Sequence, residues 1–266
     1  MGNNEAVIRV DNLVREFGGR RVLDGVTLEA YKGETLVVMG GSGCGKSTLL
    51  RHIIGTLKPD SGNIYLFGED ITAAKESRMD ELRKKIGVLF QSAALFDSLT
   101  VEENISLPLR EHTKLSESII KIIVRMKLEL VGLRGFERLY PSQISGGMKK
   151  RVGLARAIAM DPQIIFYDEP TAGLDPVVAA VIDKLILDLS EKLSISSIVV
   201  THDMNSVFRI ADRIAMLHSG RVLQVGTRDE IKNSQNEYVR QFINGDPEGP
   251  IKFFRPDEDY LKELTT

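Results

Sequence analysis

The spacing of apolar residues predicts paired strands at the beginning of the chain. Apolar residues gather at positions 6–10, 22–23 and 26–30, with the dipeptides Gly18-Gly19 and Asp24-Gly25 between these groups. Dipeptides of this kind form tight turns that join antiparallel strands. We therefore expect an antiparallel sheet with a turn at each dipeptide.

Later apolar runs are continuous rather than alternating, which is typical of strands that are buried on both faces of a parallel sheet. These runs lie at residues 34–39, 86–90, 164–167, 197–200 and 213–217. Helices are expected between them, at residues 47–55 and 177–192. Because strands alternate with helices, the pattern predicts an α/β fold with a mostly parallel sheet.

Between about residues 95 and 160 the pattern becomes helical. Apolar residues recur there at the spacing of a helix face, at Ile119, Ile120, Ile123, Val124, Met126, Leu128 and Val131. We expect a helical subdomain inserted at about residues 95–160, within a main domain that covers residues 1–233. Residues 234–266 are polar and contain prolines, and we expect them to form a C-terminal extension.

Composition excludes several classes of protein. The 266 residues include 42% hydrophobic and 27% charged residues, which excludes disordered and collagen-like chains. The 35 lysines and arginines balance 37 acidic residues, so bulk charge predicts no binding to nucleic acid. The single cysteine, Cys44, excludes an intramolecular disulfide, and no apolar stretch has the length of about 20 residues that a membrane helix needs. We expect an intracellular protein without a transmembrane segment or signal peptide.

A glycine-rich loop after the first continuous strand carries candidate chemistry. The loop fits the pattern G-x-x-x-x-G-K-[ST] and consists of Gly40, Gly41, Ser42, Gly43, Cys44, Gly45, Lys46 and Ser47, followed by Thr48. In this pattern glycines let backbone N–H groups approach phosphate oxygens, and the next helix adds the positive end of its dipole. We expect Lys46 to reach the β- and γ-phosphates and the Ser47 hydroxyl to bind Mg²⁺. The loop predicts binding of a nucleoside triphosphate.

Two adjacent carboxylates end one of the continuous strands. Asp168 and Glu169 follow the apolar run 164–167, and α/β proteins bind ligands at the carboxyl ends of such strands. We expect Asp168 to hold Mg²⁺ through water, and Glu169 to orient and deprotonate the attacking water. Alone, the pair could be solvated acids at a strand end, but the phosphate loop favours the catalytic interpretation.

Two further segments, together with the phosphate loop, resemble the nucleotide-binding subunit of ATP-binding-cassette (ABC) transporters. One is the Ser-Gly-Gly signature at residues 144–148, and the other is the segment 169–175, which ends in Asp175. The order of the motifs along the chain is also that of the family, and the resemblance covers about residues 6–230. It implies ATP hydrolysis by a P-loop NTPase core with an N-terminal antiparallel β subdomain and an inserted α-helical subdomain.

The resemblance also implies that two copies pair head to tail. Each ATP would lie between one copy's phosphate loop and the other copy's Ser145, Gly146 and Gly147, whose hydroxyl and backbone N–H groups at a helix start suit an anion. The alternative is that these residues form only a flexible turn. Met148 stands where the family usually has glutamine, and we expect altered helix contacts rather than loss of activity.

The same resemblance implies roles for residues outside these motifs. Phe17 would stack on adenine, with packing in the core as the competing role. Gln91 would contact Mg²⁺ or the attacking water, and Asp175 would bridge the two copies. His202 would bind the γ-phosphate and hold Glu169 in place. The implied catalytic residues are thus Lys46, Gln91, Glu169 and His202, and the implied metal ligands are Ser47, Gln91 and Asp168.

Two features near the motifs have competing interpretations. Cys44 is either a redox-sensing thiol whose modification blocks nucleotide binding or a small residue tolerated at a variable loop position, and we favour the second. The cations Lys149, Lys150 and Arg151 could indicate a nucleic-acid patch, but after the signature we interpret them as a solvated helix face. Arg156 is expected to support the signature from behind.

Segments outside the shared motifs resemble a subgroup, the ATPases of the Mla phospholipid-transport systems and their relatives beside Mce-domain proteins. The similar segments lie at residues 91–96, 108–113, 126–135 and 249–260. The resemblance implies a pair of ATPases under a membrane permease, with an Mce-domain lipid-binding protein and a STAS-domain regulator, at the cytoplasmic face of the bacterial inner membrane. Relatives move phospholipids in some bacteria and sterols or other lipids in others, so the cargo stays open.

Aromatic residues in the C-terminal extension argue against a disordered end, because disordered segments contain few of them. They are Tyr238, Phe242, Phe253, Phe254 and Tyr260. We expect the extension to pack on the paired ATPase and to strengthen the pair.

Other functions compete with lipid transport. The chain could serve an importer of small polar solutes, act on DNA or ribosomes as a non-transport cassette, or bind ATP as a regulator without turnover. The sequence has neither a second cassette nor a long coiled-coil insertion, which argues against the second. The presence of Glu169 and His202 argues against the third.

Overall fold

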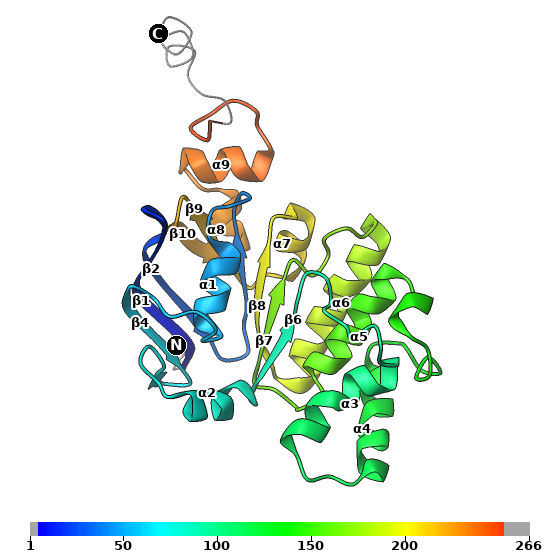
Figure 1. Ribbon diagram of the computed structural model, residues 1–266. Coiled ribbons are helices and arrows are strands. Elements are labelled where there is room, and N and C mark those ends of the chain that lie inside the picture. Colours follow the sequence, from blue (N-terminus) through cyan, green and yellow to red (C-terminus); the bar gives the residue numbers. More distant parts are fainter. Residues whose placement is uncertain (1–4, 253–266) are drawn as a thin grey trace, which may run out of the picture.

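Two β-sheets organise residues 5–252, the part of the chain that the computed structural model describes (Figure 1). The first sheet is antiparallel, with the order β2-β1-β4-β5, and contains β1 (Ala6–Phe17), β2 (Arg20–Tyr31), β4 (Ser61–Leu66) and β5 (Glu69–Asp70). The second sheet contains β3 (Thr35–Met39), β6 (Ile86–Leu89), β7 (Ile164–Asp168), β8 (Ser196–Thr201), β9 (Arg213–His218) and β10 (Arg221–Thr227).

The second sheet has the order β10-β9-β3-β8-β7-β6. Its strands β9, β3, β8, β7 and β6 run parallel, and β10 pairs antiparallel with β9. The helices are α1 (Lys46–Ile53), α2 (Glu76–Arg83), α3 (Val101–His112), α4 (Glu117–Leu130), α5 (Gly146–Ala157), α6 (Pro176–Leu193), α7 (Met204–Ile210), α8 (Arg228–Lys232) and α9 (Glu237–Asn244), with a short 3₁₀ turn η1 (Pro141–Gln143). The α/β fold predicted from the sequence is confirmed.

The first predicted turn is confirmed, and the second is wrong. Gly18-Gly19 joins β1 to β2, whereas Asp24-Gly25 lies inside β2. Leu13 pairs with Val26 and the next residue, Val14, pairs with Asp24, so Gly25 forms a bulge with φ of +74°. Glycine suits the positive φ of a turn and of a bulge equally, and the pairing with β1 decides between them.

The continuous apolar runs of the inner strands are buried because the six-stranded sheet has a core on both faces, whereas the run 86–90 forms the edge strand β6 and is only partly buried. In β3, Leu36 and Val38 pack into the core shared with the antiparallel sheet, whereas Val37 and Met39 pack into the core beneath α3, α5 and α6. Helix α1 contacts strands of both sheets and therefore lies between them. A strand enclosed in this way has no polar face, which explains why its sequence does not alternate.

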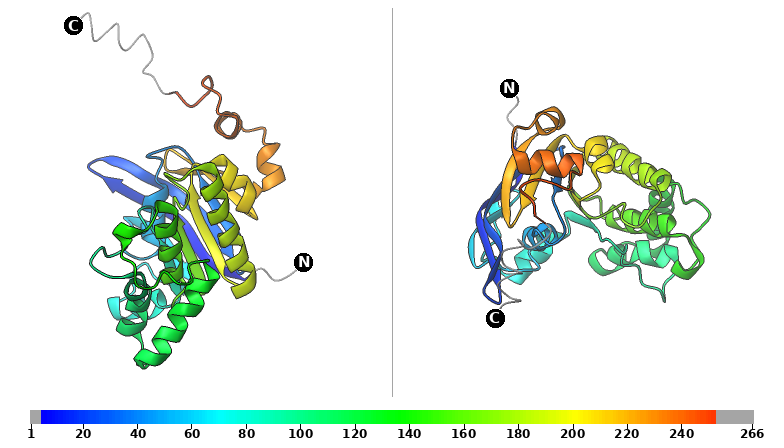
Figure 2. Two further views of the ribbon diagram at one scale, coloured as in Figure 1. Left: turned by 90° about the vertical axis from the view of Figure 1, so that its right-hand side faces the viewer. Right: turned by 90° about the horizontal axis from the view of Figure 1, so that it is seen from above.

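The segment between β6 and β7 is helical and lies to one side of the six-stranded sheet (Figures 1 and 2). It holds α3, α4, η1 and α5, in agreement with the helical pattern, while its definition as a separate subdomain stays a prediction. Thr100 caps α3 in a capping box with Glu103. Helix α5 lies close to β6, since a Cβ on Gly87 would be 2.4 Å from the carbonyl oxygen of Ala157.

The chain continues past the predicted strands into β10, α8 and α9. Strand β10 was not predicted, because most of its residues are only partly buried and its sequence is polar at several positions. Helix α9 packs on the core through Val239, Phe242 and Ile243, and the exposed Tyr238 ring lies 5.1 Å from that of His218. Phe253, Phe254 and Tyr260 lie outside the described residues. Within residues 5–252, no helix has the length and apolar character to cross a membrane.

Candidate functional site

The glycine-rich loop connects β3 to α1 and is shaped by close backbone contacts. Gly40 has φ of +158°, and a Cβ there would lie 2.1 Å from the carbonyl oxygen of Leu217. Gly45 precedes α1 with φ of +110°, and its Cβ would lie 2.8 Å from the carbonyl oxygen of Val22. Both positions therefore require glycine, whereas Gly41 has open space around it.

The turn between β9 and β10 holds the loop from behind. The N–H of Gly220 donates to the carbonyl oxygen of Cys44 over 3.1 Å, and the N–H of Asp24 donates to that of Gly220 over 2.9 Å. The Cys44 side chain is buried, and this burial raises the pKa of its thiol. Since the thiolate is the reactive form of cysteine, the burial supports the interpretation of Cys44 as a small packed residue.

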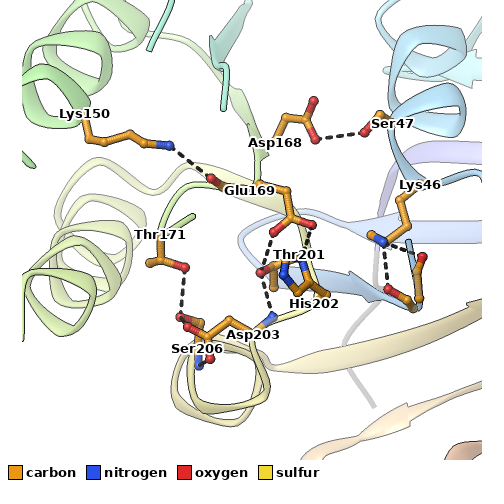
Figure 3. Close-up of polar contacts among 12 residues, drawn as sticks. Lys46, Ser47, Lys150, Asp168, Glu169, Thr171, Thr201, His202, Asp203 and Ser206 are labelled. Carbon is orange, nitrogen blue, oxygen red and sulfur yellow. Dashed lines mark hydrogen bonds and ion pairs between the residues drawn. The ribbon is translucent and has the colours of Figure 1, made fainter. Parts of the chain in front are cut away.

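Lys46 and Ser47 lie at the start of α1 and face the loop and the acidic strand end (Figure 3). The Lys46 ammonium is buried and donates to the carbonyl oxygens of Gly40 and Gly41, at 2.7 and 2.9 Å. The Ser47 hydroxyl donates to Asp168 Oδ1 over 3.1 Å, although the two residues are 121 positions apart in the sequence. Burial raises the pKa of the Asp168 carboxyl. The fold thus brings together Ser47 and Asp168, two of the three predicted Mg²⁺ ligands.

Glu169 follows β7 in a constrained backbone conformation. Its φ is +49°, which is unfavourable for a residue with a side chain and is found at functional sites. Its N–H donates to the carbonyl oxygen of Val200 over 2.9 Å, and the residue is only 9% exposed. The carboxylate is therefore fixed at the edge of the sheet.

Two neighbouring side chains hold the Glu169 carboxylate (Figure 3). The Thr201 hydroxyl donates to Oε2 over 3.1 Å, and His202 Nδ1 lies 2.8 Å from Oε1. Because an ionised carboxylate only accepts hydrogen bonds, Nδ1 carries the proton in this contact. Nε2 could then donate to a phosphate oxygen only in the doubly protonated imidazolium form. The predicted pairing of Glu169 with His202 is present in the structure, while their catalytic roles stay predictions.

Gln91 lies just after β6, beside the acidic strand end. Its side chain is exposed and lines a hollow of about 530 Å³ together with Asp168 and Gly173. Groups of three or more His, Cys, Asp or Glu side chains that could hold a metal are absent from residues 5–252. The residues that would hold a magnesium ion are Ser47, Asp168 and Gln91, and these hydroxyl, carboxylate and amide oxygens are the kind of ligands that suit Mg²⁺ together with phosphate and water.

Phe17 lies at the turn between β1 and β2. Its side chain is 45% exposed, so it is not a core residue, and the alternative of core packing is not supported. The Arg15 guanidinium lies 4.5 Å from the centre of the ring. Thr48, in the first turn of α1, is partly buried.

The Ser-Gly-Gly signature forms the start of α5. Ser145 is the N-cap, with its hydroxyl accepting the N–H of Met148 over 3.3 Å, and both Ser145 and Gly146 are exposed. Asp175 is the N-cap of α6 and accepts the N–H groups of Val177 and Val178. These caps fix both residues, so the signature is not merely a flexible turn.

The signature and the Asp175 segment pack together, away from the phosphate loop of the same chain. A Cβ on Gly147 would lie 2.5 Å from a side-chain carbon of Val178, and one on Gly146 would lie 3.8 Å from Leu174. Helices α5 and α1 lie on opposite sides of β7 and β8 in Figure 1, and Figure 2 shows the same separation. One copy alone therefore does not enclose a nucleotide between these two motifs.

Two of the three cations after the signature, Lys150 and Arg151, bind backbone carbonyl groups and do not form the solvated helix face that the sequence predicts. Lys150 is 5% exposed, and its ammonium donates to the carbonyl oxygens of Gln91 and Glu169. Arg151 donates to the carbonyl oxygens of Val131 and Gly132. The carbonyl groups that they contact are distant in the sequence, so these contacts could not be predicted from the run of charged residues alone.

Arg156 supports a different segment from the one predicted. Its guanidinium donates to the carbonyl oxygens of Ala93 and Ala94, each over 2.8 Å, and therefore holds the loop that follows Gln91 rather than the signature. Ala93 and Ala94 both have positive φ, of 61° and 46°. Such a loop needs fixed partners for its carbonyl groups, and Arg156 supplies them.

Comparisons with known proteins agree with this arrangement. Residues 23–172 match the protein family described as ABC transporter. The intermembrane phospholipid transport system ATP-binding protein MlaF of Haemophilus influenzae is 45% identical over 98% of this chain and 99% of its own length. The probable ribonucleotide transport ATP-binding protein mkl of Mycobacterium leprae is also 45% identical, over 92% of this chain and 70% of its own length.

A solved structure has the same fold. The dimeric post-hydrolysis state of the ATP-binding cassette MJ0796, bound to ADP and phosphate, has a TM-score of 0.76 and 32% identity to this chain. The match covers 83% of this chain and 98% of MJ0796. That structure contains two copies of the cassette and the products of ATP hydrolysis.

Proposed function

The chain belongs to the ABC transporter family and is one of its ATPases, and we propose that it drives the transport of phospholipids between two membranes. The observation that carries this proposal is the match to MlaF of Haemophilus influenzae over almost the full length of both proteins. The mkl protein has the same identity but extends well beyond the matched region. The match to MlaF therefore favours phospholipid over ribonucleotide as cargo.

In the proposed reaction, Lys46 and the loop N–H groups bind the phosphates, and Glu169 removes a proton from the attacking water. The ammonium of Lys46 now donates to two loop carbonyl groups and would exchange them for phosphate oxygens. Thr201 and His202 hold the carboxylate in one orientation, which favours proton transfer because the base stays within hydrogen-bond reach of the water. Bound Mg²⁺ would neutralise developing charge on the phosphate oxygens.

Two copies would pair head to tail, each completing the other's nucleotide site. Ser145 and Gly146 are exposed at the start of α5, a helix that lies apart from α1 in Figure 1. Hydroxyl and N–H groups at a helix start bind anions, so this surface suits the γ-phosphate bound by a second copy. Val177, which is 74% exposed beside Asp175, would be covered in the same contact. In this pair Asp175 would bridge the copies and Phe17 would stack on adenine.

The proposed complex places the pair under a membrane permease at the cytoplasmic face of the bacterial inner membrane. An Mce-domain protein would carry the lipid beyond the permease, and a STAS-domain protein would regulate the ATPase. Support for these partners is the likeness to MlaF, which is named as the ATP-binding protein of a transport system.

Transfer of lipid between vesicles tests the proposed cargo. The full chain is purified with the permease and Mce-domain protein of the same organism and placed in vesicles that contain fluorescent phosphatidylethanolamine. We expect ATP to start movement of the labelled lipid to or from acceptor vesicles, and we expect no movement with Lys46→Ala. ATP-dependent uptake of a radiolabelled ribonucleotide, with no lipid movement, would contradict the proposal.

The C-terminal extension is proposed to pack on the paired copy. In the described part, the Gln241 side chain bonds both the N–H and the C=O of Ile251, so the chain folds back on α9. Deletion of residues 246–266 is expected to lower dimerisation in the presence of ATP, measured by sedimentation of the Glu169→Gln chain. Unchanged dimerisation and ATPase rate would show that the extension has another role.

A further inference from the structure

Lys150 joins parts of the molecule that belong to different steps of the proposed reaction. It lies on α5, five positions after Ser145, and its buried ammonium donates to the carbonyl oxygen of Gln91. The same ammonium donates over 3.1 Å to the carbonyl oxygen of Glu169, as Figure 3 shows. These carbonyl groups belong to the loop after β6 and to the end of β7. One cation thus connects the helix of the signature to both segments beside the phosphate loop.

The contact with Glu169 acts on a constrained residue. Glu169 has φ of +49°, its N–H is held by Val200, and its C=O is held by Lys150. Both peptide groups beside the carboxylate are therefore fixed, one from β8 and one from α5. Because hydrogen bonds to charged groups are stronger than neutral ones, a shift of α5 would act directly on the backbone of Glu169.

The contact with Gln91 is part of a wider attachment of α5 to the same loop. Arg156 holds the carbonyl groups of Ala93 and Ala94, and a Cβ on Gly153 would lie 3.2 Å from the Cβ of Ala93. The loop after β6 therefore rests on α5 at three successive places. The Gln91 side chain stays exposed and free to reach a ligand, while its backbone follows the helix.

We propose that Lys150 is a positioning residue that couples the two ATP sites of the pair. The inference rests on the proposed head-to-tail dimer, in which Gln91 and Glu169 serve the site of their own copy and Ser145 serves the site of the partner. A nucleotide that moves Gln91 or Glu169 then moves α5, and with it the Ser145 hydroxyl at the other site. The same contacts act in reverse, because coupling between two sites is reciprocal.

The test uses the full transport complex and compares wild type with Lys150→Met, Lys150→Arg and Lys149→Met. Methionine keeps the length of the side chain but removes its donors, arginine keeps them, and Lys149→Met removes the same charge from the neighbouring position. The readouts are the rate of phosphate release and its Hill coefficient over a range of ATP concentrations. Two measurements show whether each variant is folded: its binding to the permease and its thermal unfolding.

We expect a Hill coefficient near 2 for wild type, which is the limit for two sites, and a value near 1 for Lys150→Met. The maximal rate of Lys150→Met should fall about tenfold, the effect of losing a hydrogen bond to a charged group. Lys150→Arg should restore cooperativity, and Lys149→Met should resemble wild type. If Lys150→Met does not fold, Lys150→Gln, which loses the charge of the donor, replaces it, and its Hill coefficient should lie below that of Lys150→Arg.

Two results would overturn the proposal. A Hill coefficient that is the same in wild type and Lys150→Met, whatever the rates, would show that Lys150 acts on its own site alone. A wild type without cooperativity would show that there is no coupling for Lys150 to carry. A wrong proposal for the head-to-tail dimer is distinguished from a wrong role of Lys150 by mixed dimers of Ser145 and Glu169 variants. These mixed dimers test the shared ATP site without any change at Lys150.

Discussion

Glu169→Gln is expected to slow ATP hydrolysis by about 10²- to 10⁴-fold while ATP binding is retained, because the variant lacks the general base but keeps the phosphate loop. The amide has the shape of the carboxylate, and its oxygen still accepts the His202 Nδ1–H. The Thr201 hydroxyl, which now donates to Glu169, can accept from the new amide group instead. The fold should therefore persist, and ATP should accumulate in the closed dimer.

Lys46→Ala is the matched contrast, since it removes a phosphate contact rather than the base. Its ATP affinity should fall about 10- to 100-fold, the range for the loss of hydrogen bonds to a charged group. Equilibrium binding of labelled ATP and single-turnover phosphate release separate the two variants. Weak binding in Glu169→Gln, or normal turnover in either variant, would contradict the assigned roles.

A mixed dimer in which Ser145→Asp and Glu169→Gln lie in the same copy is expected to lose nearly all of its ATP hydrolysis. One site then lacks its base, and the other receives a carboxylate against the γ-phosphate in place of the hydroxyl. With the two substitutions in opposite copies, both defects fall on one site, and the second site should keep up to half of the wild-type rate. The two arrangements therefore contain the same substitutions but are expected to differ strongly in ATPase rate.

The chemistry of the helix cap makes Ser145→Asp a sharp variant. Aspartate is as good an N-cap as serine, so α5 should begin at the same place. Ser145→Asn is the control, because asparagine also caps a helix but carries no charge, and its effect should be much smaller. Equal rates for the two arrangements of the mixed dimer, measured on complexes purified with a different tag on each copy, would exclude the shared site.

The motifs of the site could be predicted because each of them depends on short-range sequence. The phosphate loop requires glycine at Gly40 and Gly45, because a Cβ at either position would clash with neighbouring backbone atoms. Asp168 and Glu169 follow a run of apolar residues, and such a run predicts a strand that is buried on both faces. The contact between Ser47 and Asp168 also follows from the sequence, since the phosphate loop that leads to Ser47 follows β3, Asp168 ends β7, and the two strands run parallel in one sheet.

The rest of the site depends on contacts that no local pattern records. Lys150 is one of three adjacent cations, and only the approach of α5 to two distant carbonyl groups distinguishes it from a solvated lysine. Asp24-Gly25 has the composition of a tight turn, but the pairing register of β1 with β2 places a β-bulge there. The sequence predicts that Arg156 lies on the helix of the signature. It does not predict the hydrogen-bond partners of Arg156, because these depend on the path of residues 93–94.

The hydrogen bond from Gly220, in the β9–β10 turn, to Cys44 bears on the rate at which ATP binds. Gly220 fastens the middle of the glycine loop to the sheet, and Asp24 fastens Gly220 in turn. The conformational entropy of the loop is thus lost when the chain folds, not when a nucleotide arrives, and preorganisation of this kind removes an ordering cost from association. We therefore expect the association rate of ATP to be limited by diffusion and orientation. The rate of transport would then be limited by a later step, such as dimerisation of the two copies.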